Sequence, residues 1–178
     1  KQKKFSGKIT LIGKENLYPY QRPPLSKAYL KGEIERDRLF IKQPNFYGDI
    51  DIDFALNKEV VKVDTERKSV QTQDDEFHFK KLVLATGSRP RKIDIDGSDL
   101  GNIFYLRNIR DAENIKCAMQ KSESLVIIGA GYIGLEVAAT AIKYGLTVTV
   151  LEKEERVMNR VVSEDVSRFF QSEHENKG

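Results

Sequence analysis

Residues 125–152, with the sequence LVIIGAGYIGLEVAATAIKYGLTVTVLE, decide the fold class of this chain. An apolar run at 125–128 predicts a strand, a glycine-rich turn follows it, and apolar positions with helical spacing predict a helix at 135–144. A second apolar run at 147–151 predicts the next strand. This order of strand, turn, helix and strand is typical of a parallel β-α-β unit, so we expect an α/β fold.

The turn has the spacing G-x-G-x-x-G at Gly129, Gly131 and Gly134, which in this context indicates dinucleotide binding. We expect Gly129 to make the tight turn and Gly131 to let the backbone approach a pyrophosphate at the helix N-terminus. Gly134 should let the helix and the strand pack closely. A glycine turn in an ordinary α/β unit is the competing interpretation.

An acid, Glu152, follows the second strand, where a carboxylate typically binds the ribose 2′-hydroxyl of the adenosine. Because a carboxylate there repels a 2′-phosphate, we expect NADH to be preferred over NADPH. Two alternatives stay open. Glu152 simply ends a strand within a charged run, or one of the nearby cations Lys153, Arg156 and Arg160 accommodates a phosphate.

The earlier part of the chain predicts further strands. Residues 8–13, KITLIG, are expected to form a short buried strand, and Glu15 then occupies the place of the acid that ends the second strand of a β-α-β unit. Residues 51–79 predict a β meander with charged turns. The apolar run LVLA at 82–85 predicts a parallel strand that is buried on both faces.

Three helices are expected besides the one in the glycine-rich unit. Ser26 is a candidate N-cap for a short helix that extends to Leu30, and residues 111–120 have a helical pattern. Ser163 is expected to cap a helix at 164–175.

Composition narrows the classes of function. The net charge is only +3 over 178 residues, so we expect no nucleic-acid partner. Cys117 is the single cysteine, which excludes an internal disulfide and a C-x-x-C redox pair, and His78 and His174 lie far apart, so we predict no metal site. No apolar stretch reaches about 18 residues, so no membrane span is predicted. A reducing cytoplasm fits these features.

Three stretches carry a resemblance to a known family: YQRPPLSKAYL at 20–30, LVLATGSRPR at 82–91 and VIIGAGYIGLEVAAT at 126–140. Together they resemble the FAD-dependent, NADH-using ferredoxin, rubredoxin and putidaredoxin reductases, to which apoptosis-inducing factor is related. The resemblance covers nearly the whole chain. It implies hydride transfer from NADH to FAD, followed by electron transfer to a ferredoxin or rubredoxin-type carrier.

The same resemblance implies two Rossmann-like nucleotide-binding domains, with the β meander in the first. Residues 1–109 would be part of an FAD-binding domain, and residues 110–178 would be part of an NAD-binding domain. Both are expected to be incomplete: the FAD glycine loop would lie upstream of Lys1, and the second half of the NAD-binding domain would lie downstream of Gly178.

The resemblance also implies roles for particular residues. Lys27 and Glu136 would form the catalytic pair where the flavin meets the nicotinamide; a surface lysine and a first-turn carboxylate are the competing interpretations. The FAD-binding residues would be Glu15, Arg22, Lys27, Val60, Thr86, Gly87, Arg91 and Arg107, and the NAD-binding residues Gly129, Gly131, Tyr132, Ile133, Gly134, Glu152 and Arg160.

Three other interpretations remain. A disulfide reductase would need a cysteine pair near the flavin, and the single cysteine argues against it. A redox-responsive NADH-binding interaction protein, like apoptosis-inducing factor, would use the same motifs without feeding an electron carrier. A fragment without activity is the third alternative.

Overall fold

The computed structural model describes residues 5–50 and 52–178. Residues 1 and 51, where the predicted first domain and the predicted meander begin, lie outside the described residues. The chain divides into two compact units. The first unit contains residues 1–21 and 39–88, and the second contains residues 22–38 and 89–178.

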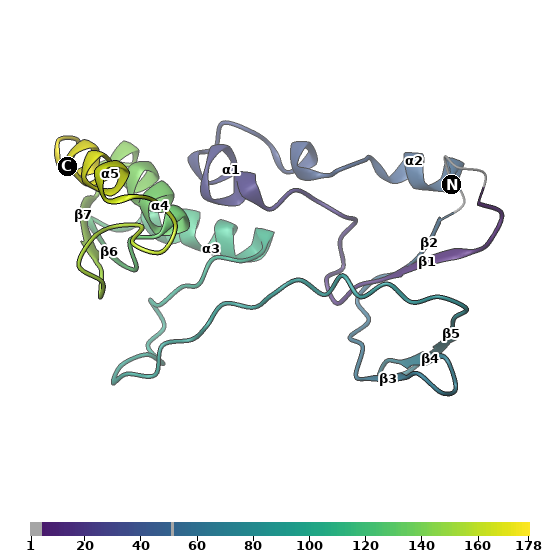
Figure 1. The fold of residues 1–178 in the computed structure, drawn as a ribbon. Coiled ribbons are helices and arrows are strands. Elements are labelled where there is room, and N and C mark those ends of the chain that lie inside the picture. Colours follow the sequence, from purple (N-terminus) through teal and green to yellow (C-terminus); the bar gives the residue numbers. More distant parts are fainter. Residues whose placement is uncertain (1–4, 51) are drawn as a thin grey trace. The chain divides into compact units, whose positions relative to one another are not determined.

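The first unit contains two small sheets (Figure 1). Strand β1 (Ile9–Ile12) pairs in parallel with β2 (Ile52–Ala55). Strands β3 (Lys62–Asp64), β4 (Ser69–Gln71) and β5 (Glu76–His78) form an antiparallel meander. Both the early strand and the meander are therefore confirmed, although β2 belongs to the other sheet. The early strand is not buried as predicted, because all of its residues are at least partly exposed, Leu11 to 37%.

Stacked and edge-on aromatic rings stabilise the β1–β2 sheet. Helix α2 (Pro44–Asp49) carries the buried Tyr47, whose ring stacks on Tyr18 at 5.6 Å between centroids. Phe54 of β2 meets both rings edge-on at 4.8 Å. Aromatic pairs of this geometry add to the stabilisation that burial itself gives.

The predicted buried strand at 82–85 is wrong. The backbone there has no strand conformation, and the Val83 and Leu84 side chains are 85% and 69% exposed. An apolar strand needs partners for its backbone groups and cover for both faces. In the described part of the chain neither β1 nor β2 pairs with this segment.

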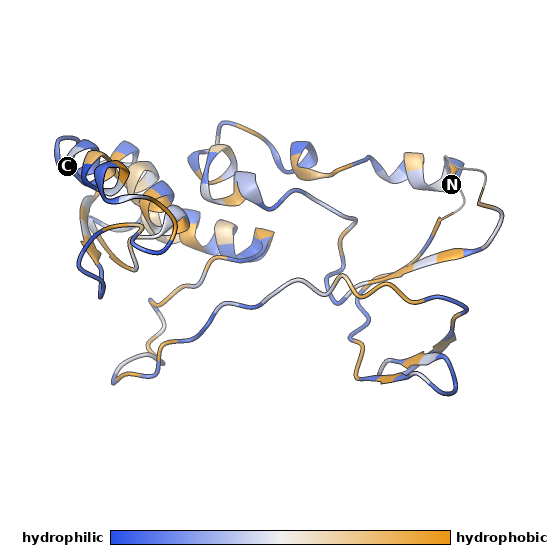
Figure 2. Ribbon diagram, viewed as in Figure 1, coloured by the Kyte–Doolittle hydropathy of each residue, from blue (hydrophilic) through white to orange (hydrophobic). Residues whose placement is uncertain are grey.

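The second unit contains the predicted β-α-β unit. Strand β6 (Ser124–Ile128), helix α4 (Tyr132–Lys143) and strand β7 (Thr147–Leu151) follow one another, and β6 pairs in parallel with β7, with Ser124 opposite Thr147. Figure 2 shows the mainly apolar colouring of α4, which fits a helix packed against a sheet.

Helices α3 (Ile109–Met119) and α5 (Glu164–Glu175) confirm the other long helices predicted. Asn108 begins α3 with a capping box, because its side chain accepts from the Asp111 N–H while the Asp111 carboxylate accepts from the Asn108 N–H. Ser163 is the N-cap residue of α5, as predicted, but its side chain makes no capping hydrogen bond.

The proline-rich segment folds as short helical turns: η1 (Pro23–Ser26), α1 (Ala28–Lys31) and η2 (Arg36–Leu39). Leu30 is fully buried in the core of the second unit with Ile115, Met119, Val137, Ala141 and Leu146. The Tyr144 hydroxyl donates to the Leu30 carbonyl at 3.1 Å. Packing therefore fixes residues 22–31 against α3 and α4, and this positions the side chains considered next.

Candidate cofactor-binding site

Two glycines of the loop are required by the fold itself. Gly129 has φ +102°, a conformation that favours glycine, and its N–H donates to the Leu151 carbonyl at 2.7 Å. At Gly134 a Cβ atom would lie 2.0 Å from the Gly129 carbonyl oxygen. Any larger side chain at Gly134 would push α4 away from the loop, as the sequence predicted.

Gly131 is different, because neither its backbone conformation nor the space beside it requires a glycine. Its backbone has φ −80° and ψ −177°, which any residue adopts, and a Cβ atom would meet nothing within 4 Å. Helix α4 begins at the next residue, and its N-cap provides no side-chain hydrogen bond. An open approach to the N–H groups at a helix N-terminus fits a pyrophosphate.

The Glu152 carboxylate is fixed by the backbone around it. Its Oε2 accepts from the Ala130 N–H at 2.7 Å, and its Oε1 accepts from the N–H groups of Lys153 and Glu154 at 2.8 and 3.0 Å. The Glu154 and Ala130 N–H groups hold the pKa of Glu152 below its usual value. Glu152 thus does more than end a strand: an ionised carboxylate is held against the glycine loop.

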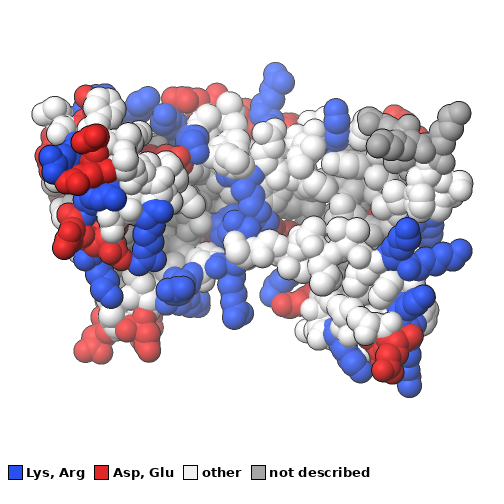
Figure 3. Space-filling view, in the orientation of Figure 1, with Lys and Arg blue, Asp and Glu red and all other residues white. Residues whose placement is uncertain are grey.

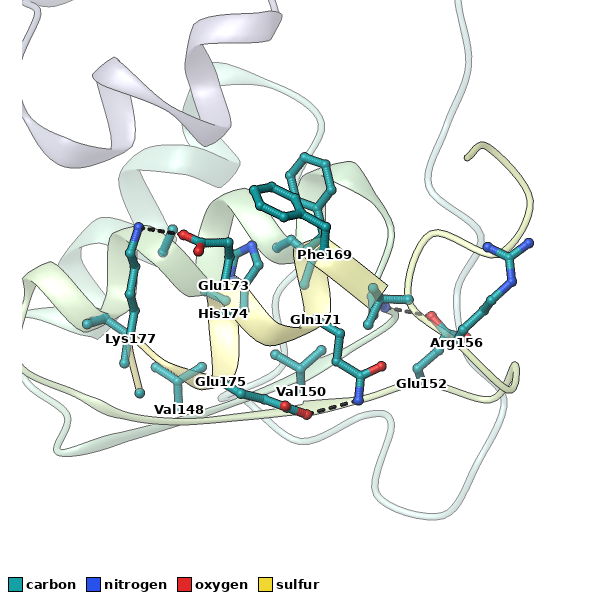
Figure 4. Close-up of a pocket in the computed structure, with 18 of the residues that line it drawn as sticks. Val148, Val150, Glu152, Arg156, Phe169, Gln171, Glu173, His174, Glu175 and Lys177 are labelled. Carbon is teal, nitrogen blue, oxygen red and sulfur yellow. Dashed lines mark hydrogen bonds and ion pairs between the residues drawn. The ribbon is translucent and has the colours of Figure 1, made fainter. Parts of the chain in front are cut away.

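Arg156 and Arg160, two of the cations near Glu152, have side-chain partners. Arg156 donates to the carbonyls of Val162, Ser163 and Asn159 at 3.1, 3.4 and 3.2 Å, which holds the loop after β7 together. Arg160 pairs with Glu154 at 2.6 Å. Figure 4 shows Glu152 and Arg156 near each other beside a cavity lined by Val148, Val150 and Phe169.

Lys27 and Glu136, the two residues predicted to be catalytic, form an ion pair. Lys27 Nζ lies 2.9 Å from Glu136 Oε1. Ser26, which is 5% exposed, donates from Oγ to the other carboxylate oxygen, Glu136 Oε2, at 2.5 Å. Both oxygens of Glu136 are therefore held by neighbouring residues of one short segment.

Ser26 was missed as a functional residue, and its predicted role as a helix cap is wrong. The N-cap position of α1 belongs to Lys27. No sequence pattern relates Ser26 to Glu136, since they are far apart in the chain and meet only because Leu30 is buried against α4.

A cavity brings residues implied for FAD together with residues implied for NAD. Arg22 Nη1 donates to the Arg107 carbonyl at 2.7 Å across one side of it. All of the lining residues belong to the second unit, and they are Arg22, Pro23, Leu25, Ser26, Lys27, Leu106, Arg107, Tyr132, Ile133 and Glu136.

The other residues implied for FAD are divided between the two units. Glu15, Val60, Thr86 and Gly87 belong to the first unit, where the Tyr20 hydroxyl donates to the Glu15 carboxylate at 2.6 Å. Val60, Thr86 and Gly87 are exposed, and Gly87 has φ +67°. Arg91 is an exposed residue of the second unit. Their roles stay predictions.

Within residues 5–50 and 52–178, no three acidic, histidine or cysteine side chains lie close enough together to hold a metal ion. None of the helices in this part of the chain is both long and apolar enough to cross a membrane. Figure 3 shows basic and acidic side chains interspersed on the face seen.

The profile of the pyridine nucleotide-disulphide oxidoreductase family matches residues 1–178. The chain is 40% identical over 175 residues to rubredoxin-NAD(+) reductase of Pseudomonas putida, with 98% of the chain and 46% of that protein aligned. The chain thus spans less than half the length of this relative.

Two solved structures are similar with a TM-score of 0.95 each. One is a ferredoxin reductase from Rhodopseudomonas palustris, 39% identical, and the match covers 99% of this chain and 44% of that one. The other is the covalent complex of putidaredoxin reductase with putidaredoxin, 38% identical, covering 99% and 43%. These similarities, with the parallel pairs β1–β2 and β6–β7, confirm the α/β, Rossmann-like fold class.

Proposed function

The chain belongs to the pyridine nucleotide-disulphide oxidoreductase family, and we propose that the whole protein is an NADH-dependent, FAD-containing ferredoxin or rubredoxin reductase. The observation that carries this proposal is the cavity whose wall combines Arg22, Lys27 and Arg107 with Tyr132 and Glu136. Residues implied for two different cofactors line one space, as electron transfer between the cofactors requires.

The chain's own residues would bind and orient the nucleotide. The N–H groups at the start of α4 would hold the pyrophosphate, and the missing side chain at Gly131 would let it approach. When bound in contact, the nicotinamide and the flavin supply the hydride chemistry, and the protein supplies their alignment.

Lys27 and Glu136 would control the charge at the wall of the cavity. Glu136 holds Lys27 in one place, so that its ammonium group is available where negative charge accumulates during reduction. Ser26 holds the second oxygen of Glu136, which limits rotation of the carboxylate. The three residues would therefore act as a fixed electrostatic element rather than as proton donors.

The preference for NADH belongs to the same proposal. Glu152 stays ionised and faces the glycine loop, where it would accept a hydrogen bond from a ribose hydroxyl and repel a 2′-phosphate. The partners of Arg156 and Arg160 support this preference, because neither side chain is a ready phosphate ligand. Arg160 would still lie at the adenosine end of the site.

The names of the similar proteins support the choice of electron acceptor. They include a rubredoxin reductase, a ferredoxin reductase and a complex with putidaredoxin. We therefore propose a ferredoxin or rubredoxin-type acceptor and a cytoplasmic location. We also propose that residues 1–109 contribute to FAD binding and residues 110–178 to NAD binding, with residues 22–38 packed in the second unit.

The decisive experiment is reduction kinetics of the full-length flavoprotein, followed by flavin absorbance after rapid mixing with NADH. We expect fast reduction that Lys27→Met and Glu136→Gln slow, whereas Lys121→Met at an exposed lysine leaves the rate unchanged. Reduced protein should then reduce a ferredoxin or rubredoxin. Negligible transfer to every carrier, with NADH binding intact, would favour the redox-responsive interaction protein instead.

A further inference from the structure

Three charged side chains form a cluster directly after β7. Glu152 and Glu154 are joined through the backbone, because the Glu154 N–H donates to Glu152 Oε1 at 3.0 Å. Arg160 Nη2 lies 2.6 Å from Glu154 Oε1 and also interacts electrostatically with Glu152. The acid expected to meet the ribose and the arginine expected nearby are thus connected through Glu154.

Glu154 is better fixed than its position in a charged loop suggests. Its side chain is 34% exposed, whereas that of Arg160 is 79% exposed. Asn159 donates from Nδ2 to the second oxygen, Glu154 Oε2, at 3.4 Å. The carboxylate is therefore held by the loop, and the more exposed partner of the pair is the arginine.

A bound 2′-phosphate would need a cation close to Glu152. Arg156 is unsuitable, because its guanidinium is used by three backbone carbonyls and its removal would release the loop. Arg160 is exposed, but the Glu154 carboxylate competes with a phosphate for its N–H donors. Glu154 also adds a negative charge of its own beside the position of the phosphate.

We propose that Glu154 is a second specificity-determining residue, which excludes NADPH by occupying Arg160. This inference rests on the proposed function, since it assumes that a nicotinamide nucleotide binds along the glycine loop to Glu152. It assigns the discrimination to two acids with different tasks. Glu152 contacts the ribose, and Glu154 engages the Arg160 guanidinium, which could otherwise compensate a phosphate.

The test is direct binding of NADH and NADPH to the full-length protein by calorimetry at low ionic strength. Glu154→Gln should tighten NADPH binding about five- to tenfold and change NADH binding less than about twofold, as expected for release of an exposed ion pair together with loss of one repelling charge. Arg160→Gln alone should change the ratio of NADPH affinity to NADH affinity little, because Arg160 is already paired with Glu154.

The double variant Glu154→Gln with Arg160→Gln separates the two contributions. It should bind NADPH about two- to fivefold more weakly than Glu154→Gln does, because that part of the gain in affinity comes from the released guanidinium. Glu155→Gln is the matched control, since it removes an exposed acid next to Glu154 and should change neither affinity by more than about twofold.

The proposal would be overturned by an unchanged ratio of NADPH to NADH affinity in Glu154→Gln, or by a gain in NADPH affinity that the double variant keeps in full. Equal gains in Glu155→Gln and Glu154→Gln would also overturn it, because a general charge effect would then explain both. In each of these results NADH still binds. Failure of the unaltered protein to bind either nucleotide would instead contradict the proposed function.

Discussion

The substitution Gly134→Ala tests the packing of the glycine loop most directly. An alanine Cβ would lie 2.0 Å from the Gly129 carbonyl oxygen and 3.3 Å from Ile127 Cγ2. Ordinary contact begins at 3.4 Å, so the oxygen would have to move by 3.4 − 2.0 = 1.4 Å. The obstacle is backbone at a residue with φ +102°, which has little freedom to move.

The expected magnitude follows from two opposing effects. Overpacking of this kind costs about 3 kcal/mol, at the upper end of the usual range, because a backbone atom must move. Alanine is favoured over glycine within a helix by about 1 kcal/mol, and Gly134 lies in the first turn of α4. The net loss should be about 2 kcal/mol, which lowers the melting temperature by roughly 4–8 °C for a chain of this size.

Thermal unfolding without added nucleotide measures this effect, and Gly131→Ala is the matched control. At Gly131 a Cβ atom would meet nothing within 4 Å, so the free energy of unfolding should fall by no more than about 1 kcal/mol, the cost of alanine at the N-cap of α4. The same variant should weaken NADH binding at least about tenfold, because the methyl group would occupy the approach to the pyrophosphate. A melting temperature for Gly134→Ala within about 1 °C of the unaltered protein would refute the packing argument.

Three further predictions concern the core, the acid and the catalytic pair. Leu30→Ala should cost about 2–5 kcal/mol in urea unfolding, whereas Leu100→Ala at a 61% exposed side chain should cost less than about 0.5 kcal/mol; similar costs would contradict the core assignment. Glu152 has a pKa below its usual 4.5, so its contribution to stability is complete above about pH 4.5 and is lost as the pH falls through the lowered value. The difference in melting temperature between the unaltered protein and Glu152→Gln should therefore shrink from about pH 6 to about pH 3, and a constant difference would count against it. Ser26→Ala should slow flavin reduction by NADH by up to about tenfold, with Ser26→Thr restoring the rate; equal rates in all three proteins would remove Ser26 from the proposed electrostatic element.

The β-α-β unit was predictable because local rules decide it. Apolar runs for β6 and β7, helical spacing between them and glycines at fixed positions all point to one arrangement. Backbone geometry explains both glycines: Gly129 has a positive φ angle, and a Cβ atom on Gly134 would clash with the Gly129 carbonyl oxygen. Such requirements do not depend on the rest of the protein.

The apolar run at 82–85 shows that local sequence rules alone do not predict whether a strand forms. Its composition describes a strand that is covered on both faces, but whether a strand forms depends on neighbours that composition does not provide. The Ser26–Glu136 hydrogen bond is the opposite case: here a contact forms that the sequence did not predict. Only the burial of Leu30 beside α4 brings these side chains together, and no spacing in the sequence expresses that contact.

Glycine loops are usually treated as one motif, but here the three glycines have two different roles, one in folding and one in ligand approach. Gly129 and Gly134 serve the backbone conformation and the packing of the loop, so they would be favoured even in a unit that binds nothing. Gly131 has an ordinary conformation and open space beside it, so folding alone would tolerate a side chain there. The competing interpretation of the motif as a plain α/β turn requires the first two glycines, whereas at the third, the N-cap of α4, it only favours a glycine. The position that the fold does not need is therefore the best local evidence that this loop binds a phosphate.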